Sequence, residues 1–383
     1  MKRKTNLFLS PAKFGDWDIA QGGGAPEKAY NPWQIKAGAE RGEVEYDPVL
    51  KDLRTGPVAA SLMRKVRGNP FGHLMVYPFF RCPNHCVFCG EDEAMRTFAA
   101  QPLSMREIAS ILLVKKRQGI RSVTFSGGEP TNYPRFWEVL SLAKKLGYHT
   151  EIFTCGANLA DPEFARRTLP CLDRALVTVE GYDARSHDPL TERAGSFKRL
   201  DRALRNLDAA GNVELRTNTV VVRQNLPKLG KIVDYVCSFK NVRQIWLSVA
   251  APGGSMGRNW DKMTFRVEEL LDRVPGLHDK VRAKGKRLLL YNTLFCLADS
   301  PDLVAELCMP LTILVTRRQG GLHEEISPNP IADKVLLSKC AGCAYERKCG
   351  GVWKHYYDRY GDVWVPGIPR GKGLAASAGP CVP

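Results

Sequence analysis

The chain has 383 residues, of which 44% are hydrophobic, so it can form one large domain with an appendage or two domains. No apolar run approaches the roughly 20 residues that span a bilayer, and the run after the basic start is too short for a signal peptide, so we expect a cytoplasmic protein without a membrane partner. The 56 Lys and Arg against 40 Asp and Glu give a net charge of +16. This charge favours acidic partners such as nucleic acid or acidic peptide segments, but its even spread also fits a generally basic surface.

Residues 1–70 lack sustained periodicity and predict an irregular N-terminal extension. From 71 to 262, strand and helix patterns alternate, which implies a parallel sheet covered by helices. The expected strands are 73–80, 122–130 (ending in a glycine turn), 149–156, 174–181, 213–223 and 242–250, and the expected helices are 104–118, 134–147, 161–169, 196–211 and 226–239. Six such units predict an α/β fold, a partial (β/α)6 barrel with its ligands at the carboxyl ends of the strands.

After residue 262 the pattern changes. One more helix is expected over 264–274, followed by a cysteine-bearing region that becomes rich in Gly and Pro toward its end. We therefore assign residues 263–383 to a second, smaller module.

The chain contains 12 cysteines. In a cytoplasmic protein of this length, clustered cysteines are more typical of metal ligands than of disulfides. Two clusters stand out, at 82–89 and 340–349, while Cys155, Cys171 and Cys237 are isolated and are expected to be small buried hydrophobic residues.

The first cluster, RCPNHCVFCG, places Cys82, Cys86 and Cys89 in a C-x3-C-x2-C pattern. Structural zinc sites use four ligands, and a [4Fe–4S] cluster normally takes four thiolates. Three thiolates leave one iron open to bind a substrate or a cofactor. Because the loop follows the first expected strand, it lies at the end of the sheet where active sites form.

A second motif, SGGEP, follows one strand later at 126–130. Gly127 and Gly128 allow the backbone to approach a ligand closely, and Glu129 can accept hydrogen bonds from an ammonium group. Taken alone, the motif fits a plain glycine turn better than a ligand site.

Together, CPNHCVFC, with Phe88 before its third cysteine, and GGEP resemble the radical S-adenosylmethionine (radical SAM) superfamily. The resemblance implies that Cys82, Cys86 and Cys89 hold three irons of a [4Fe–4S] cluster while SAM chelates the fourth. It also implies that the Gly127–Glu129 turn secures the SAM amino group, and that polar residues on later strands contact the rest of SAM. Candidates for those contacts are Glu180, Arg216 and Asn218, and Phe88 in the cysteine loop is a further cofactor-binding candidate.

The chemistry implied by this resemblance is reductive cleavage of SAM. An electron from an external donor, flavodoxin or ferredoxin, would release a 5′-deoxyadenosyl radical that takes a hydrogen atom from the substrate. The protein would orient and shield these groups.

The second cysteine cluster, KCAGCAYERKCGG, resembles the auxiliary-cluster modules called SPASM and twitch. Ile326 and Trp353 stand where the full SPASM pattern has cysteines, so the resemblance implies one auxiliary [4Fe–4S] cluster instead of two. Its ligands would be Cys340, Cys343, Cys349 and Cys381, with Cys308 or Cys296 in reserve. Zinc is the alternative metal for these thiols.

Three functions remain open from the sequence. The first is radical modification of a peptide or protein side chain, which the auxiliary module favours. The second is radical modification of a nucleic acid base or nucleoside, which the net charge favours. The third is a non-catalytic binding protein stabilised by zinc.

Overall fold

The computed structural model describes residues 72–297, 303–305, 312–318, 321–327, 334–341, 343, 349 and 351–361. The expected N-terminal extension 1–70, Cys308 and Cys381 lie outside these residues. No helix in the described ranges combines the length and apolarity needed to cross a bilayer.

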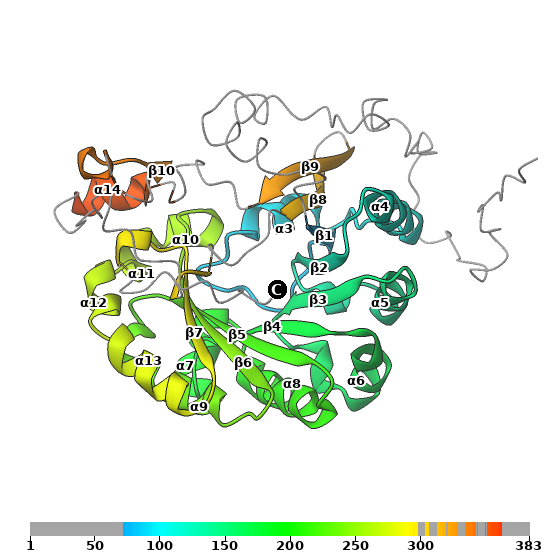
Figure 1. Cartoon of the computed structure of the whole chain (residues 1–383), viewed down its shortest axis with the longest axis horizontal. Helices are drawn as coiled ribbons and strands as arrows, with labels where there is room; N and C mark the ends of the chain where they lie inside the picture. The colour runs from blue at the N-terminus through cyan, green and yellow to red at the C-terminus, as the bar shows by residue number, and fades with distance from the viewer. Residues whose placement is uncertain are drawn as a thin grey trace, which may run out of the picture. The chain divides into compact units, whose positions relative to one another are not determined.

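A nine-stranded sheet forms the centre of the described fold, in the order β7-β6-β5-β4-β3-β2-β1-β8-β9 (Figure 1). All neighbouring strands are parallel except β8 and β9, which pair antiparallel. The strands are β1 (His73–Phe79), β2 (Ser122–Gly127), β3 (His149–Thr154), β4 (Arg174–Thr178), β5 (Glu214–Val221), β6 (Val242–Val249), β7 (Arg287–Tyr291), β8 (Thr312–Arg318) and β9 (Gly321–Ser327). The predicted open, mainly parallel α/β sheet is therefore confirmed.

Helices α4, α5, α6, α8 and α9 cover the outer face of the curved sheet (Figure 1). The helices are α3 (Asp92–Phe98), α4 (Met105–Arg117), α5 (Phe136–Lys145), α6 (Pro162–Thr168), α7 (Ala184–Thr191), α8 (Ser196–Ala210), α9 (Leu229–Cys237), α10 (Gly254–Arg258), α11 (Trp260–Met263), α12 (Val267–Leu271), α13 (Val274–Ala283) and α14 (Lys354–Tyr360). The helix expected over 264–274 is instead the pair α12 and α13. Pro275 lies in the first turn of α13, where a missing backbone N–H costs nothing, whereas inside one continuous helix it would break a hydrogen bond.

The alternation of side chains along each strand separates the core from the site. On β5, Leu215 and Val221 are fully buried in the main core, together with Leu200 and Leu204 of α8. Arg216 and Asn218 lie on the opposite face of the same strand, because successive side chains point to opposite faces of a sheet. The outer face therefore supplies the main core, and the inner face carries polar groups beside a smaller apolar cluster of Leu176, Trp246, Leu289 and Ala305.

The sheet continues past residue 262, where we expected the second module to begin. Strand β7 pairs with β6, and β8 pairs with β1. Ion pairs then join the β8–β9 hairpin to α4: Arg317 bonds both carboxylate oxygens of Glu107 (2.7 and 2.9 Å), and Lys115 bonds Glu324 (2.7 Å). The sheet accordingly has nine strands instead of six.

A small separate element follows. Strands β10 (Lys334–Val335) and β11 (Val352–Trp353) pair antiparallel, and α14 follows directly. This element packs on α12 through a second apolar cluster of buried residues, which consists of Val267, Leu294, Leu337, Cys340, Val352 and Tyr356.

Candidate active site

The cysteine loop, residues 81–90, leaves the carboxyl end of β1 and is held by two helices. The backbone N–H of Val87 donates to the carbonyl of Leu190 in α7 (3.0 Å), and the N–H of Ser255 in α10 donates to the carbonyl of Cys89 (2.9 Å). Phe88 is partly buried and packs against an apolar cluster of Leu190, Val222, Ala250, Met256 and Met263. The loop is thus fixed at both its middle and its end.

The three thiols of the loop are partly buried and interact electrostatically. Burial raises the pKa of Cys86 well above its usual value, and it raises the pKa of Cys89 to about 11. Bound iron stabilises the thiolate form that burial alone disfavours. No three Cys, His, Asp or Glu side chains in the described ranges are already arranged as a metal site.

The glycines of the SGGEP turn are required by the chain that enters the cysteine loop. Gly127 has a φ of +109°, and a Cβ on it would lie 2.7 Å from the carbonyl oxygen of Phe79. A Cβ on Gly128 would lie 2.6 Å from the carbonyl oxygen of Arg81. We expected the glycines to admit a ligand; in this structure they admit the backbone of residues 79–81 and thereby fix the start of the loop.

The carboxylate of Glu129 is buried, with 1% of its surface exposed, and is fully bonded within the protein. One oxygen accepts from the backbone and hydroxyl of Thr131 (3.0 and 2.6 Å) and from the hydroxyl of Thr154 (2.7 Å). The other accepts from the backbone N–H of Cys155 (2.7 Å). Glu129 therefore joins the glycine turn to the end of β3.

Cys155 belongs to the site, which the sequence analysis missed. Its interaction with Cys82 raises the pKa of the Cys155 thiol well above the usual value, whereas Cys171 and Cys237 pack against the main core as expected. The sequence could have placed Cys155 at the site, because it lies at the carboxyl end of the third expected strand, beside the strand that carries SGGEP.

Glu180 follows β4 and is also buried, with 1% exposed. Its Oε2 accepts from the backbone N–H of Val220 (3.0 Å), while Oε1 has no hydrogen-bond partner among the described residues. Glu180 interacts electrostatically with Cys86, and burial raises the pKa of its carboxyl group well above the usual value. An unpartnered buried oxygen beside the cysteine loop is a fit for a polar ligand.

His187 lies behind Glu180. From the sequence alone, the position of His187 and Asp188 after the fourth expected strand favours a surface or helix-capping role. Asp188 does cap, accepting from the backbone N–H groups of Gly195 and Phe197 at the start of α8 (2.7 Å each). His187, however, is 2% exposed, and its Nδ1 accepts from the backbone N–H of Glu180 (3.1 Å).

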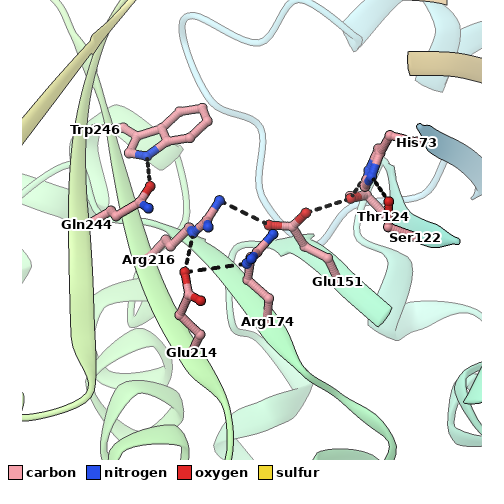
Figure 2. A network of polar contacts seen from close by, with 9 residues as sticks. All are labelled: His73, Ser122, Thr124, Glu151, Arg174, Glu214, Arg216, Gln244 and Trp246. Carbon is pink, nitrogen blue, oxygen red and sulfur yellow. Dashed lines mark hydrogen bonds and ion pairs between the residues drawn. The ribbon is translucent and has the colours of Figure 1, made fainter. Parts of the chain in front are cut away.

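Arg216 is not brought together with the cysteine loop. Figure 2 shows it in a polar network on the inner face of the sheet, where it donates to Glu214 (2.7 Å) and lies 4.0 Å from Glu151. The network continues through Thr124 to His73 on β1 (2.8 and 2.7 Å). These residues come from the first halves of their strands. They therefore lie toward the amino ends of the strands, whereas the cysteine loop lies at the carboxyl ends.

Asn218 lies two residues further along β5, nearer the carboxyl end of the strand. Its side-chain oxygen accepts a hydrogen bond from Ser248 of β6 (2.5 Å). Asn218 thus shares the inner face of the sheet with Arg216.

Residues 76–236 match the Radical SAM superfamily. This segment contains the cysteine loop, the glycine turn and strands β2 to β5, so the part of the chain that carries the candidate site is similar to radical SAM domains.

Two curated relatives are similar to part of the chain. Mycofactocin maturase MftC of Mycobacterium ulcerans is 28% identical over 221 residues, which are 57% of this chain and 57% of the relative. PqqA peptide cyclase of Rhodopseudomonas palustris is 31% identical over 157 residues, which are 40% of each protein. The chain thus spans about half the length of the curated relatives it matches.

One solved structure has a similar fold. Streptococcus suis SuiB bound to its precursor peptide SuiA aligns with a TM-score of 0.55 and 16% identity, covering 94% of this chain and 84% of that chain. At this identity the likeness concerns the fold alone.

Proposed function

We propose that this protein is a radical SAM enzyme that modifies a side chain of a peptide or protein. The observation that carries the proposal is the cysteine loop itself, held by α7 and α10 beside the unpartnered oxygen of Glu180. Three partly buried thiols with a polar acceptor next to them fit a cluster that leaves one iron for SAM. The match to the Radical SAM superfamily supports iron over the zinc alternative at this loop.

The residues of the candidate active site have separate roles in binding the cluster and SAM. Cys82, Cys86 and Cys89 hold the [4Fe–4S] cluster, which, when bound and reduced, supplies the electron that cleaves SAM to a 5′-deoxyadenosyl radical. Glu180 and Asn218 orient SAM from the inner face of the sheet. The backbone of the glycine turn faces the SAM amino group, while the carboxylate of Glu129 holds that turn in place.

Two of the sequence-based contacts change role in this proposal. Arg216 stabilises the polar network near the amino ends of the strands and does not contact SAM. Phe88 packs its ring against the apolar cluster under the loop, and so positions Cys86 and Cys89 on either side of it.

A peptide substrate is supported by the relatives. SuiB was solved with a precursor peptide bound, and PqqA peptide cyclase carries a peptide in its name. A single auxiliary [4Fe–4S] cluster in the second cysteine set, and flavodoxin or ferredoxin as the electron donor, complete the proposal. The cytoplasm is the expected compartment, because both clusters require reduced thiols.

The test is an anaerobic assay of reconstituted protein with dithionite and SAM, which follows 5′-deoxyadenosine and counts iron on the same sample. We expect about eight irons per chain, about four for each cluster, and 5′-deoxyadenosine. Replacing Cys82, Cys86 and Cys89 together with Ala should abolish SAM cleavage, whereas the control C171A should not. If the triple variant still forms 5′-deoxyadenosine, the cysteine loop is not the active site.

A further inference from the structure

Two buried arginines, Arg174 of β4 and Arg216 of β5, project from neighbouring strands onto the inner face of the sheet (Figure 2). Their side chains are only 10% and 11% exposed. Burial lowers the pKa of Arg216, and the charges of Glu151 and Glu214 offset this effect only in part. The two carboxylates therefore do not fully compensate for the burial of this positive charge.

Most of the hydrogen-bond donors of this arginine pair are unused. A guanidinium group carries five N–H donors. Arg216 donates from Nε to Oε1 of Glu214 (2.7 Å), and its Nη1 lies 4.0 Å from Glu151. Arg174 makes no hydrogen bond among the described residues, and its buried Nε lies 3.4 Å from the same oxygen of Glu214. Buried donors require acceptors, so the pair can bond an acceptor that these residues do not supply.

The charges around the arginine pair favour one kind of acceptor. The planar guanidinium fork matches the oxygens of a carboxylate or of a phosphate. Glu151 and Glu214 lie within 4.0 Å of the arginines, and their repulsion of a bound anion grows with the charge of that anion. A singly charged carboxylate therefore fits better than a doubly charged phosphate. Water is the alternative acceptor.

An apolar surface lies beside the arginine pair on the same face of the sheet. Arg216 pairs with Leu176 of β4, and two residues further along β5, Asn218 pairs with Trp246 of β6. Leu176 and Trp246 belong to the smaller apolar cluster of the inner face, and the rings of Trp246 and Tyr291 lie 5.8 Å apart, centre to centre. Apolar surface thus extends from the arginines toward the carboxyl ends of the strands, where the candidate SAM site lies.

We propose that Arg174 and Arg216 form a subsite that binds a carboxylate of the peptide substrate, with the apolar part of that substrate against Trp246 and Tyr291. The inference rests on the proposed function and names a chemical feature of its substrate. Asn218 lies roughly 7 Å further along the strand than Arg216, because inward-facing side chains are two residues apart. A carboxylate held by the arginines therefore directs the rest of its residue toward the candidate SAM site.

The first experiment needs no variant. Binding of phenylacetate, an aromatic group with one carboxylate, is compared with binding of its neutral amide and of phenyl phosphate, by anaerobic equilibrium dialysis of the reconstituted full chain. We expect phenylacetate to bind at least about tenfold more tightly than the amide, because hydrogen bonds to charged groups are lost in the amide, and more tightly than phenyl phosphate. Equal binding of acid and amide, or no binding of either, would mean that water alone satisfies the arginines. Tighter binding of phenyl phosphate would overturn the assignment to a carboxylate.

The variant R174Q assigns the binding to this site. Arg174 makes no hydrogen bond in the described ranges, so its replacement removes few contacts of the fold, which iron content and urea denaturation would check. We expect R174Q to bind phenylacetate about tenfold more weakly and to bind the amide unchanged. The control R205Q removes an exposed arginine of α8 that pairs with Asp201 (2.8 Å), and it should bind both compounds as the wild type does. Unchanged phenylacetate binding by R174Q would place the carboxylate elsewhere.

Competition by short peptides distinguishes the two sources of a carboxylate. Peptides that end in Phe-Glu or Phe-Gln, each with a free or an amidated chain end, compete against phenylacetate. Competition by the amidated Glu peptide identifies an acidic side chain, and competition by the free Gln peptide identifies the chain end. If the amidated Gln peptide, which has no carboxylate, competes equally well, the inference is wrong.

The formation of 5′-deoxyadenosine, measured on the same protein, separates this inference from the proposed function. SAM cleavage without carboxylate binding would overturn the arginine subsite alone. Carboxylate binding that R174Q weakens, in a protein that does not cleave SAM, would overturn the proposed function and leave a carboxylate site on the inner face of the sheet.

Discussion

Glu129 connects three parts of the candidate active site through one buried carboxylate. Replacing it with Gln keeps the shape but puts an amide NH2 group against N–H or O–H donors, leaving at least one buried donor unpaired. We expect E129Q to lower the free energy of unfolding by about 1–3 kcal/mol and to weaken SAM binding, because the glycine turn loses its tie to β3. Urea denaturation and equilibrium SAM binding would measure both effects.

A matched control is E163Q, which alters an exposed ion pair with Arg166 and Arg167. It should change stability by less than about 1 kcal/mol. If E129Q bound SAM poorly while keeping wild-type stability, its carboxylate would contact SAM directly, as the sequence analysis first suggested.

His187 predicts a pH dependence of stability. Burial lowers the pKa of His187 from 6.5 to about 4, so between these values the unfolded chain binds a proton that the folded chain excludes. The contribution of His187 is therefore complete above pH 6.5 and is lost as the pH falls toward 4. Between pH 7 and pH 5.5 the loss should be about 1 kcal/mol.

The variant H187Q tests this contribution, because a glutamine oxygen can still accept the N–H of Glu180 but does not titrate. Denaturation of both proteins at several pH values between 5.5 and 7 removes the effect of other groups by difference. We expect the wild type to lose stability more steeply than H187Q on acidification. Parallel curves would show that folding does not lower the pKa of His187.

The sequence located the thiols of the site better than it located the ligand contacts. A cysteine pattern depends only on spacing within one loop, so Cys82, Cys86 and Cys89 could be found directly. On a strand, the two-residue period shows which face a side chain occupies but not how far along the strand it lies. Arg216 and Asn218 share a face, yet pairing with β4 sets Arg216 opposite Leu176 and Asn218 opposite Thr178 at the strand end.

Among the elements, the β10–β11 pair predicts a substitution that affects one cluster alone. In G351A the new Cβ would collide with the carbonyl of Val335 and the backbone would be strained at its positive φ. We expect the loop with the second cysteine set to open, which removes about four of about eight irons and spares the first cluster. Iron counting and 5′-deoxyadenosine formation without substrate would be measured together.

Gly361 provides the control, because its φ is +70° but a Cβ there meets no atom within 4 Å. G361A has the backbone strain without the collision, and should keep all of its iron. Equal iron loss in both variants would mean that strain alone, and not the close approach to β10, disrupts the loop.

Most elements of the sheet followed from apolar periodicity, and those that were missed have identifiable causes. Helix α7 was missed because Pro189 inside it predicts a helix break. The helix nevertheless forms, and Asp183 and Ser186 cap its start reciprocally. Strands β7 and β8 are short apolar runs that lie among the later cysteines, so we assigned them to the second module. Their membership of the sheet depends on pairing with β6 and β1, which are distant in sequence.

At the scale of the whole molecule, these distant pairings support the active site. Strand β1, which leads into the cysteine loop, lies between β2 and β8 and is not at an edge of the sheet. The hairpin of β8 and β9 is in turn joined to α4 by the Arg317 and Lys115 ion pairs. The loop therefore leaves a strand that is paired on both sides, which limits movement at its base.

The net charge of +16 predicts how the whole molecule interacts with nucleic acid. We expect DNA and RNA to bind without sequence preference, since no block of basic residues or base-reading motif is evident. Binding of this kind releases counterions, so affinity should fall steeply, by about 10³-fold or more between 50 and 200 mM salt for six or more phosphate contacts. Heparin, a polyanion without bases, should compete equally well.

The same salt series distinguishes a binding partner from a substrate. If peptides are the substrates, nucleic acid should leave 5′-deoxyadenosine formation unchanged at 200 mM salt, where electrostatic attraction is screened. A candidate peptide should raise it under the same conditions. A nucleic acid that stimulates SAM cleavage at this salt concentration, and that heparin cannot replace, would transfer the proposed chemistry from peptide side chains to bases or nucleosides.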